Sequence, residues 1–256
     1  MGFELTREID YFQTAPDSRV RLDSFVRILQ DAAISHVHSA ALSPLSDKTL
    51  RGGPNTPNVL IAEGYAWILN KLAVEIRHRP VYGELVTVRT WHRGRKGFKS
   101  FREYEVICNG EQVAVAASSW LYLDLNRRRV VRVPEATDDL YGIEPEFALD
   151  WDIEAWKPNK KLMPDFEIAI TTRRSDYDML EHVNNAVYFD YLDTLVERAT
   201  GGGGAIKRVA IQYNKEIGRH VTGLNAGLSI GNAAGRAFVI QGADGVYACG
   251  NIGLEF

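Results

Sequence analysis

The chain has 256 residues, of which 45% are hydrophobic and 25% are charged, close to the averages of soluble globular proteins. Its net charge of −3 gives no overall attraction to nucleic acid or to membranes, so an electrostatic partner needs a local patch. Two cysteines without CxxC spacing argue against a disulfide framework. No stretch reaches the roughly 20 apolar residues of a membrane span, and the acidic N-terminus has no apolar signal core. These features predict a cytoplasmic protein.

The first strongly periodic segment runs from residue 22 to residue 42. Its apolar side chains recur at steps of three and four, as on one face of a helix. Two histidines, His36 and His38, lie two apart on this helix and therefore point to different sides, so we expect surface side chains rather than metal ligands. Residues 46–58 are polar, contain proline and glycine, and predict a loop.

Strand-like runs follow the predicted loop, and apolar residues alternate within them. They span residues 67–77, 85–92, 100–108 and 113–125. Asn109 and Gly110 separate the last two runs, and this pair is the strongest short hairpin signal. One helix followed by an antiparallel meander is therefore predicted for residues 1–130. Residues 134–160, with three prolines among acidic residues, predict a linker.

The second half repeats this plan. A strand at residues 166–172 and a helix at residues 185–199 are predicted, and the glycines of residues 201–204 end the helix. Further strand-like runs span residues 206–213, 224–230, 237–241 and 246–254. The order of strand, helix and antiparallel strands predicts an α+β fold of two similar units, each a long helix packed on a curled antiparallel sheet.

The turn before the second helix concentrates polar side chains: Asp176, Asp178, Glu181, His182, Asn184 and Asn185. A carboxylate and an imidazole four residues apart, Asp178 and His182, can converge on one site if the segment turns. The carboxylate can then act as nucleophile or base, and the imidazole can transfer a proton. N–H groups at the helix start can stabilise an oxyanion. The same residue types also favour helix starts for capping alone, so both interpretations stay open on these residues.

A resemblance to a known family adds to this pattern. Residues 174–188 resemble the D-x-D-x-x-x-H-V-N-N-x-x-Y signature of hot-dog-fold thioesterases, most of all that of plant and bacterial acyl-acyl carrier protein thioesterases. Residues 25–33 are similar to the L-Q-E-A-A helix of that family. Residues 67–91 contain matches to its W-x-L, I-x-R, P-x-x-G-D and T-W elements. Several matches in the same order over most of the chain are more specific than the single turn.

The resemblance implies a double hot-dog fold. Residues 1–133 would form an N-terminal unit with the acyl-chain pocket, residues 134–160 a linker, and residues 161–256 a C-terminal unit with the catalytic residues. The implied reaction hydrolyses the thioester of a fatty acyl-acyl carrier protein without a metal or another cofactor. An acyl-CoA thioesterase and a non-catalytic acyl-thioester binding protein are the alternatives. A homodimer is possible for such a chain.

The family's catalytic aspartate, histidine and glutamate match Asp178, His182 and Glu216. The residue after this glutamate is Ile217, where the family has cysteine, so a cysteine nucleophile at that position is excluded. The family usually has asparagine two residues after the aspartate, where this chain has Leu180. The role of that amide passes to Asn184, to a main-chain N–H or to a water, or the activity is reduced.

In the implied mechanism, the thioester carbonyl points at the helix start near residues 183–186, where N–H groups stabilise the oxyanion. Asp178 or Glu216 activates water, or Asp178 attacks directly, and His182 supports proton transfer. Two basic stretches, at residues 93–102 and 127–132, either dock the acidic acyl carrier protein or are ordinary solvated strand ends and turns.

Overall fold

The computed structural model describes residues 2–41, 64–202, 204–221, 223–229 and 236–255. The predicted loop at residues 46–58 lies outside the described residues. Both predicted long helices are present, α1 (Leu22–Ala41) and α4 (Val187–Thr200). Helix α4 begins two residues later than predicted, and Gly201, with φ of 65°, ends it in the left-handed conformation that favours glycine.

Each predicted strand is also present. Those of the first half are β2 (Tyr65–Ile76), β3 (Leu85–Lys96), β4 (Lys99–Cys108) and β5 (Glu111–Asp124). Those of the second half are β7 (Phe166–Thr171), β8 (Ala205–Tyr213), β9 (Gly223–Ser229), β10 (Arg236–Gly242) and β11 (Gly245–Glu255). Strands β1 (Phe3–Glu8) and β6 (Arg129–Val131) and helix α3 (Ala136–Tyr141) were not predicted. Both strands are largely exposed, so they lack the apolar alternation that marks a strand in the sequence.

The hairpin predicted at Asn109 and Gly110 is confirmed. It joins β4 to β5, whose residues Cys108 and Glu111 are paired. Asn109 and Gly110 have φ of 52° and 79°. Positive φ at both central residues is what a two-residue turn needs if its twist is to match that of the flanking strands.

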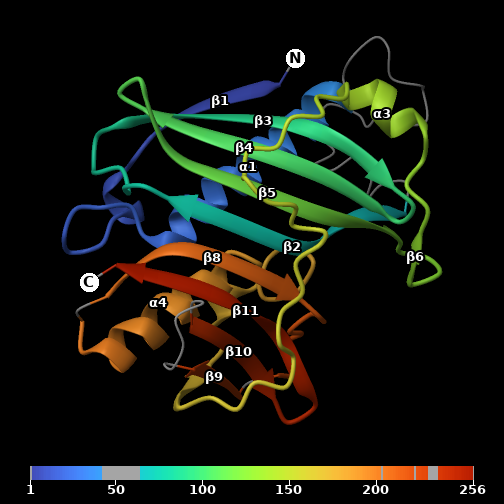
Figure 1. Cartoon of the computed structure of the whole chain (residues 1–256). Coiled ribbons are helices and arrows are strands. Elements are labelled where there is room, and N and C mark those ends of the chain that lie inside the picture. Colours follow the sequence, from blue (N-terminus) through green and yellow to red (C-terminus); the bar gives the residue numbers. More distant parts are fainter. Residues whose placement is uncertain (1, 42–63, 203, 222, 230–235, 256) are drawn as a thin grey trace.

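The strands form one continuous antiparallel sheet in the order β1-β3-β4-β5-β2-β8-β11-β10-β9-β7, with β6 paired to β5 (Figure 1). Strands β2 and β8 join the two units. Ala73 lies opposite Ala210 at the centre of this seam, Lys71 lies opposite Gln212, and Glu75 lies opposite Arg208. Each pair is equidistant from the central alanines, so an approximate two-fold axis passes between Ala73 and Ala210.

Irregularities in the two central strands follow the same symmetry. The pairing of β2 with β5 shifts between Leu69 and Lys71, so Asn70 is left out of the ladder. The pairing of β8 with β11 shifts in the same way around Lys207. Asn70 and Lys207 each lie three residues before the central alanine of their strand. A bulge re-aims the side chain at that position and is common beside functional sites.

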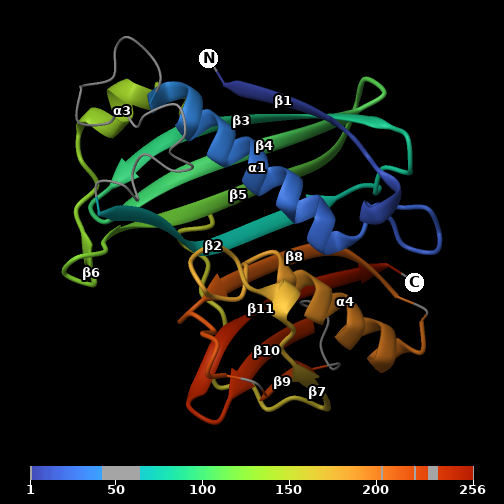
Figure 2. The same ribbon diagram turned by 180° about the vertical axis from the view of Figure 1, so that it is seen from behind.

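Helices α1 and α4 lie on the same face of the sheet (Figure 2). Each buries one apolar face, as its periodicity predicted. The buried residues of α1 include Leu22, Phe25, Val26, Leu29, Ala32 and Ala33, and those of α4 include Tyr188, Tyr191, Leu192, Leu195 and Val196. Both sets belong to one core that extends through the two units. No helix in the described part of the chain has the length and apolar character that crossing a bilayer requires.

The connection between the units crosses the opposite face of the sheet (Figure 1). Leu149 and Ile153 pack there against the central alanines, Ala73 and Ala210. The buried Lys71 ammonium donates to the carbonyl oxygens of Ile153, Glu154 and Trp156, at 3.1, 3.3 and 2.6 Å. Burial lowers the pKa of Lys71, and the three carbonyls satisfy its hydrogens. The segment is therefore fixed across the seam.

Candidate functional site

Asp178 and His182 face each other across a tight hairpin. The N–H of Asp178 donates to the carbonyl of His182 at 2.9 Å, and the N–H of Glu181 donates to the carbonyl of Asp178 at 3.0 Å. Glu181 has φ of 63°, and Tyr177 pairs with Val183 at the base of the hairpin. Directly opposed residues in an antiparallel pair point to the same face with Cβ atoms about 5 Å apart. The turn thus gives Asp178 and His182 a common face, as the four-residue spacing suggested.

Glu216 reaches the same place from the segment after β8. Its Oε2 lies 3.1 Å from Nε2 of His182, and the two side chains are 49% and 36% exposed. The main chain holds this pair in register, because the N–H of Val183 donates to the carbonyl of Ile217 at 2.9 Å. The structure therefore brings together the imidazole and the carboxylate that the resemblance singled out, with solvent access to both.

The surroundings of Asp176, the first aspartate of the D-x-D signature, indicate a structural role. Asp176 is buried and accepts hydrogen bonds from the N–H of Arg173, from Nε of Arg173 and from the hydroxyl of Tyr191, at 2.8, 3.0 and 2.8 Å. Three donors leave this carboxylate little capacity for a substrate. It fixes the short turn before the hairpin instead.

Leu180 has no polar group at the position where the family usually has an asparagine amide, and it is 40% exposed. Asp178 uses Oδ1 to accept the N–H of Leu180 at 2.9 Å. Within the described residues, the other carboxylate oxygen of Asp178 has no hydrogen-bond partner, so it can receive a ligand. Asn184 does not offer its carbonyl oxygen in place of the missing amide, because Oδ1 of Asn184 accepts the N–H of Ala186 at 2.9 Å at the start of α4.

The main-chain N–H groups expected to hold an oxyanion are mostly engaged inside the protein. The N–H of Val183 donates to Ile217, that of Asn184 donates to the carbonyl of Asp176 at 2.8 Å, and that of Ala186 is taken by the cap. Among the described residues, the N–H of Asn185 has no acceptor. The prediction of several free donors at residues 183–186 is therefore wrong, since one N–H remains.

The cysteines and the tyrosines near the site stay protonated. Both Cys108 and Cys249 are buried, and burial raises the pKa of Cys108 to about 11. Ile217 is fully buried at the position where a cysteine nucleophile was excluded. Burial also raises the pKa of Tyr188 and Tyr213. No group of three or more metal-ligating side chains comes together within the described ranges.

His36 is buried, so the prediction of a surface side chain was wrong. Its Nδ1 lies 2.8 Å from Nη1 of Arg102, which is also buried. Burial, followed by the charge of Arg102, lowers the pKa of His36 to about 3, so the neutral ring accepts from the guanidinium. Arg93 is largely buried as well, with Nε 2.7 Å from Glu103. Arg93 and Arg102 therefore do not contribute to a docking surface, whereas residues 127–129 and 132 are exposed.

The hairpin backbone occurs a second time, before α1. We call residues 10–21 the first loop and residues 173–184 the second loop. In the first loop the N–H of Ala15 donates to Arg19 at 2.8 Å, that of Ser18 donates to Ala15 at 2.9 Å, and Ser18 has φ of 65°. The N–H of Val20 then donates to the carbonyl of Pro80 at 2.8 Å. These bonds repeat those of the second loop one for one.

The shared backbone identifies corresponding side chains. Ala15 and Arg19 hold the places of Asp178 and His182 in the hairpin. Arg79 precedes Pro80 as Glu216 precedes Ile217, so an arginine stands at the place of the glutamate. The set of Asp178, His182 and Glu216 thus has no equivalent beside the first loop.

Solved structures share the architecture of this chain. The 12:0-ACP thioesterase from Umbellularia californica superposes with a TM-score of 0.81 at 19% sequence identity, covering 99% of this chain and 97% of that one. A putative oleoyl thioesterase from Lactobacillus plantarum also gives a TM-score of 0.81, at 19% identity over 100% of this chain and 96% of the other. At these identities the likeness shows the fold, and the predicted pair of hot-dog units is confirmed.

Curated sequences give related matches. A chloroplastic palmitoyl-acyl carrier protein thioesterase from Arabidopsis thaliana is 29% identical over 250 residues, which cover 91% of this chain and 57% of that protein. A chloroplastic acyl-[acyl-carrier-protein] hydrolase from Cuphea viscosissima is 26% identical over 227 residues, 85% of this chain and 52% of that protein. The chain thus spans little more than half the length of these relatives.

Family profiles cover most of the sequence. Residues 3–141 match the acyl-ACP thioesterase N-terminal domain, and residues 159–229 match the acyl-ACP thioesterase C-terminal domain. The segment between the two matches is the one that crosses the outer face of the seam. Together the two matches show that the chain belongs to the acyl-ACP thioesterase family.

Proposed function

We propose that this protein hydrolyses the thioester of a fatty acyl chain carried on acyl carrier protein and releases the free fatty acid. The observation that carries the proposal is the 3.1 Å pair of His182 and Glu216 beside the available carboxylate oxygen of Asp178. Membership of the acyl-ACP thioesterase family supports this activity. The names of the relatives, an acyl carrier protein thioesterase and an acyl-carrier-protein hydrolase, support the carrier.

In the proposed mechanism, Asp178 takes a proton from a water molecule that attacks the thioester carbonyl. The negative charge on the carbonyl oxygen is stabilised by the N–H of Asn185, which has no internal acceptor. Collapse of this intermediate breaks the carbon–sulfur bond. His182, oriented by Glu216, receives the proton from Asp178 and passes it to the departing thiolate, which restores both groups. A thiolate is a good leaving group, so this last transfer contributes less to the rate than activation of the water.

Symmetry supplies a candidate for the amide that is lost at Leu180. Lys207, at the bulge of β8, lines a cavity together with Arg19 and Arg79. The symmetric bulge of β2 carries Asn70, which is partly exposed. We infer that Asn70 stands beside His182 and Glu216 as Lys207 stands beside Arg19 and Arg79. Its side-chain amide would orient the water or the carbonyl.

The proposal assigns a role to each part of the chain. Residues 1–133 would hold the acyl chain, residues 161–256 would carry the catalytic residues, and residues 134–160 would link them. The exposed arginines of residues 127–132 form a basic turn that suits docking of an acidic carrier protein. We place this reaction in the cytoplasm, where the free thiols of two buried cysteines persist.

Thiol release by the purified protein tests the activity, with acyl carrier protein and CoA bearing the same acyl chain. We expect the carrier-protein substrate to react faster, and Asp178→Ala to lower the rate by about 10²–10⁴-fold. Asp31→Ala is the matched control, because it removes an exposed carboxylate that pairs with Arg7 at 3.0 Å far from the second loop. Its rate should equal that of the parent.

The outcomes separate the alternatives. Equal or faster turnover of the CoA substrate would favour an acyl-CoA thioesterase. A parent-like rate in Asp178→Ala would refute the role of Asp178. If neither protein releases thiol while both bind long-chain acyl thioesters, the chain is an acyl-thioester binding protein. A parent-like rate in Asn70→Ala would remove Asn70 from the mechanism without affecting the rest.

A further inference from the structure

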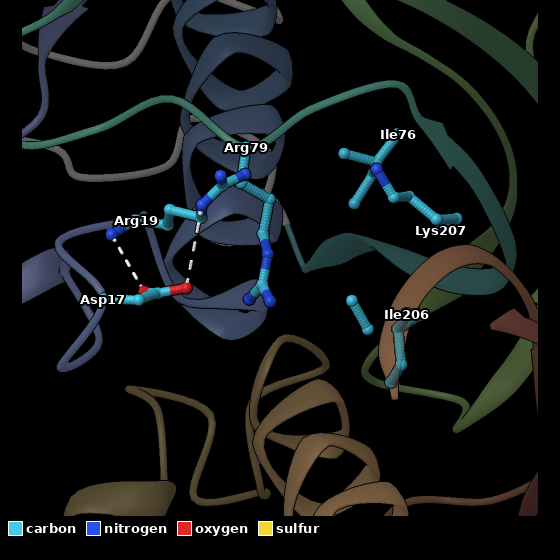
Figure 3. Close-up of a pocket in the computed structure, with 7 residues that line it drawn as sticks. Asp17, Arg19, Ile76, Arg79, Ile206 and Lys207 are labelled. Carbon is cyan, nitrogen blue, oxygen red and sulfur yellow. Dashed lines mark hydrogen bonds and ion pairs between the residues drawn. The ribbon is translucent and has the colours of Figure 1, made fainter. Parts of the chain in front are cut away.

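The first loop borders a cavity of about 280 Å³ at the place that corresponds to the His182–Glu216 site (Figure 3). The first unit contributes Asp17 and Arg19 from the loop, together with Ile76 and Arg79 after β2. The second unit contributes the start of β8, residues 205–207. The cavity thus lies at the opposite end of the seam from the proposed catalytic residues, and both units build it.

Positive charge predominates around this cavity. Arg19, Arg79 and Lys207 contribute three cations, against the single carboxylate of Asp17 in the lining. The side chain of Arg79 is only 16% exposed. A largely desolvated guanidinium attracts an anion more strongly than one in open solvent.

The partners of the two arginines within the protein do not fully neutralise their positive charge. Asp17 lies 3.8 Å from Nε of Arg19, and both side chains are about half exposed (Figure 3). Arg79 donates weakly to the carbonyl of Val20 at 3.4 Å and lies 3.7 Å from Asp193. Nζ of Lys207 donates to the carbonyl of Arg77 at 2.7 Å. The guanidinium groups of Arg19 and Arg79 retain N–H donors for a ligand.

The rest of the wall is aliphatic. Ile76, Ala205 and Ile206 line it, and the two isoleucines are 5% and 2% exposed. The cavity has the volume of roughly nine molecules of liquid water. That space suits a small ligand with an anionic head and a short apolar tail. A neutral lipid would leave the guanidinium groups without a counter-charge.

We propose that this cavity is a second binding site, which takes the carboxylate of a short fatty acid. Arg19 and Arg79 hold the carboxylate, and Ile76 and Ile206 contact the chain. The site rests on the proposed function only for the source of its ligand, because thioester hydrolysis releases such an acid. Binding itself requires no catalysis.

Titration of the ¹⁵N-labelled protein with octanoate, followed by NMR, tests the site. We expect shifts in the main-chain amides of Arg19, Ile76 and Lys207. Arg19→Gln should raise the dissociation constant measured from those shifts at least tenfold. The matched control is Arg27→Gln, since Arg27 is 44% exposed on α1 and lies 3.4 Å from Asp23, outside the cavity. It should bind octanoate like the parent.

Two further probes define the ligand. Octylammonium has a similar tail with the opposite charge, and it should leave these amides unmoved. Inorganic phosphate should bind more weakly than octanoate. The proposal is overturned if octanoate shifts only amides near the second loop, if Arg19→Gln binds it as the parent does, or if phosphate binds as tightly. Because the readout is binding, an inactive protein can pass this test and an active one can fail it.

Discussion

The first and second loops have the same backbone and different chemistry. Both form a hairpin closed by a residue with positive φ, and in both a valine N–H donates to the segment after the neighbouring seam strand. The second loop presents Asp178 and His182 to Glu216, whereas the first presents Ala15 and Arg19 near Arg79. Main-chain hydrogen bonds therefore set this shape, since few side chains are common to both loops.

One side-chain role is nevertheless shared. In the first loop, the side chain of Gln13 accepts the N–H of Asp10 at 3.0 Å. In the second loop, Asp176 accepts the N–H of Arg173 at 2.8 Å. Each side chain closes a short turn, because it accepts the N–H of the residue three positions before it. Different residue types thus do the same structural work, which hides the repeat in the sequence.

The largest expected effect separates these two capping residues. Asp176→Ala should lower the free energy of unfolding by about 3 kcal/mol, because it leaves the buried hydroxyl of Tyr191 and the groups of Arg173 without their acceptor. Gln13→Ala should cost about 1 kcal/mol, since its partner lies in a more exposed turn. Urea denaturation monitored by circular dichroism measures both. Equal losses would show that the two caps are energetically alike.

A second difference concerns the helices that follow the loops. His36 of α1 is buried where α4, counted from the same hairpin, has Ala199. The pKa of His36 falls to about 3 in the folded protein from about 6.5 in the unfolded chain. The unfolded chain therefore binds a proton first as the pH falls below 6.5, and folding loses stability between that pH and 3.

The expected loss through His36 is about 2 kcal/mol between pH 7 and pH 5. His36→Gln retains an acceptor for Arg102 and should lose correspondingly less stability over the same interval. The difference in stability loss between parent and variant removes the contribution of other titrating groups, including His92, which lies in the same cluster. Urea denaturation at the two pH values provides the measurement. Parallel losses in parent and variant would mean that His36 does not stay neutral in the folded state.

A smaller effect is expected at Leu180. Leu180→Asn would place an amide two residues after Asp178, where the family usually has one, and it should raise kcat/KM severalfold, equivalent to about 1 kcal/mol of transition-state stabilisation. Met179→Asn is the control, because Met179 is adjacent and 68% exposed. An unchanged kcat/KM in Leu180→Asn would indicate that another group, such as Asn70, already fills the role.

The smallest effect tests whether the two hairpins are equally strained. Ser18 and Glu181 have φ of 65° and 63°, in the left-handed region that disfavours side chains. Ser18→Gly and Glu181→Gly should each raise the free energy of unfolding by less than about 1 kcal/mol, since glycine relieves strain but also loosens the unfolded chain. Thermal unfolding would show the shifts. Opposite signs would mean that the loops differ in backbone energy as well as in chemistry.

Much of the fold could be predicted from the sequence because its helices and strands follow local periodicity. Both helices and the strongly alternating strands were found in this way, and so was the Asn109–Gly110 turn. The burial of His36 was also accessible, since it lies three and four residues after the buried Ala33 and Ala32 on the same helical face. The spacing between the two histidines does not by itself contain that signal.

The seam and the final geometry of the site could not be predicted locally. Nothing in β2 or β8 alone shows that they pair with each other rather than remain edge strands. Glu216 was assigned by resemblance, and its contact with His182 depends on the long-range pairing of Val183 with Ile217. The engagement of the N–H groups at residues 183–186 depends on the same pairing. The cavity beside Arg19 needs residues from both units, so it has no motif of its own.

Both units that meet at the β2–β8 seam belong to one polypeptide, and this has an evolutionary consequence. In a dimer of identical subunits, any substitution in one loop is made in both symmetric sites, so neither can specialise alone. Once two such units share one polypeptide, each copy of the loop can mutate independently. One copy can then keep the acid and imidazole while the other acquires arginines. Independent mutation of the two copies would account for the contrast between His182 and Arg19.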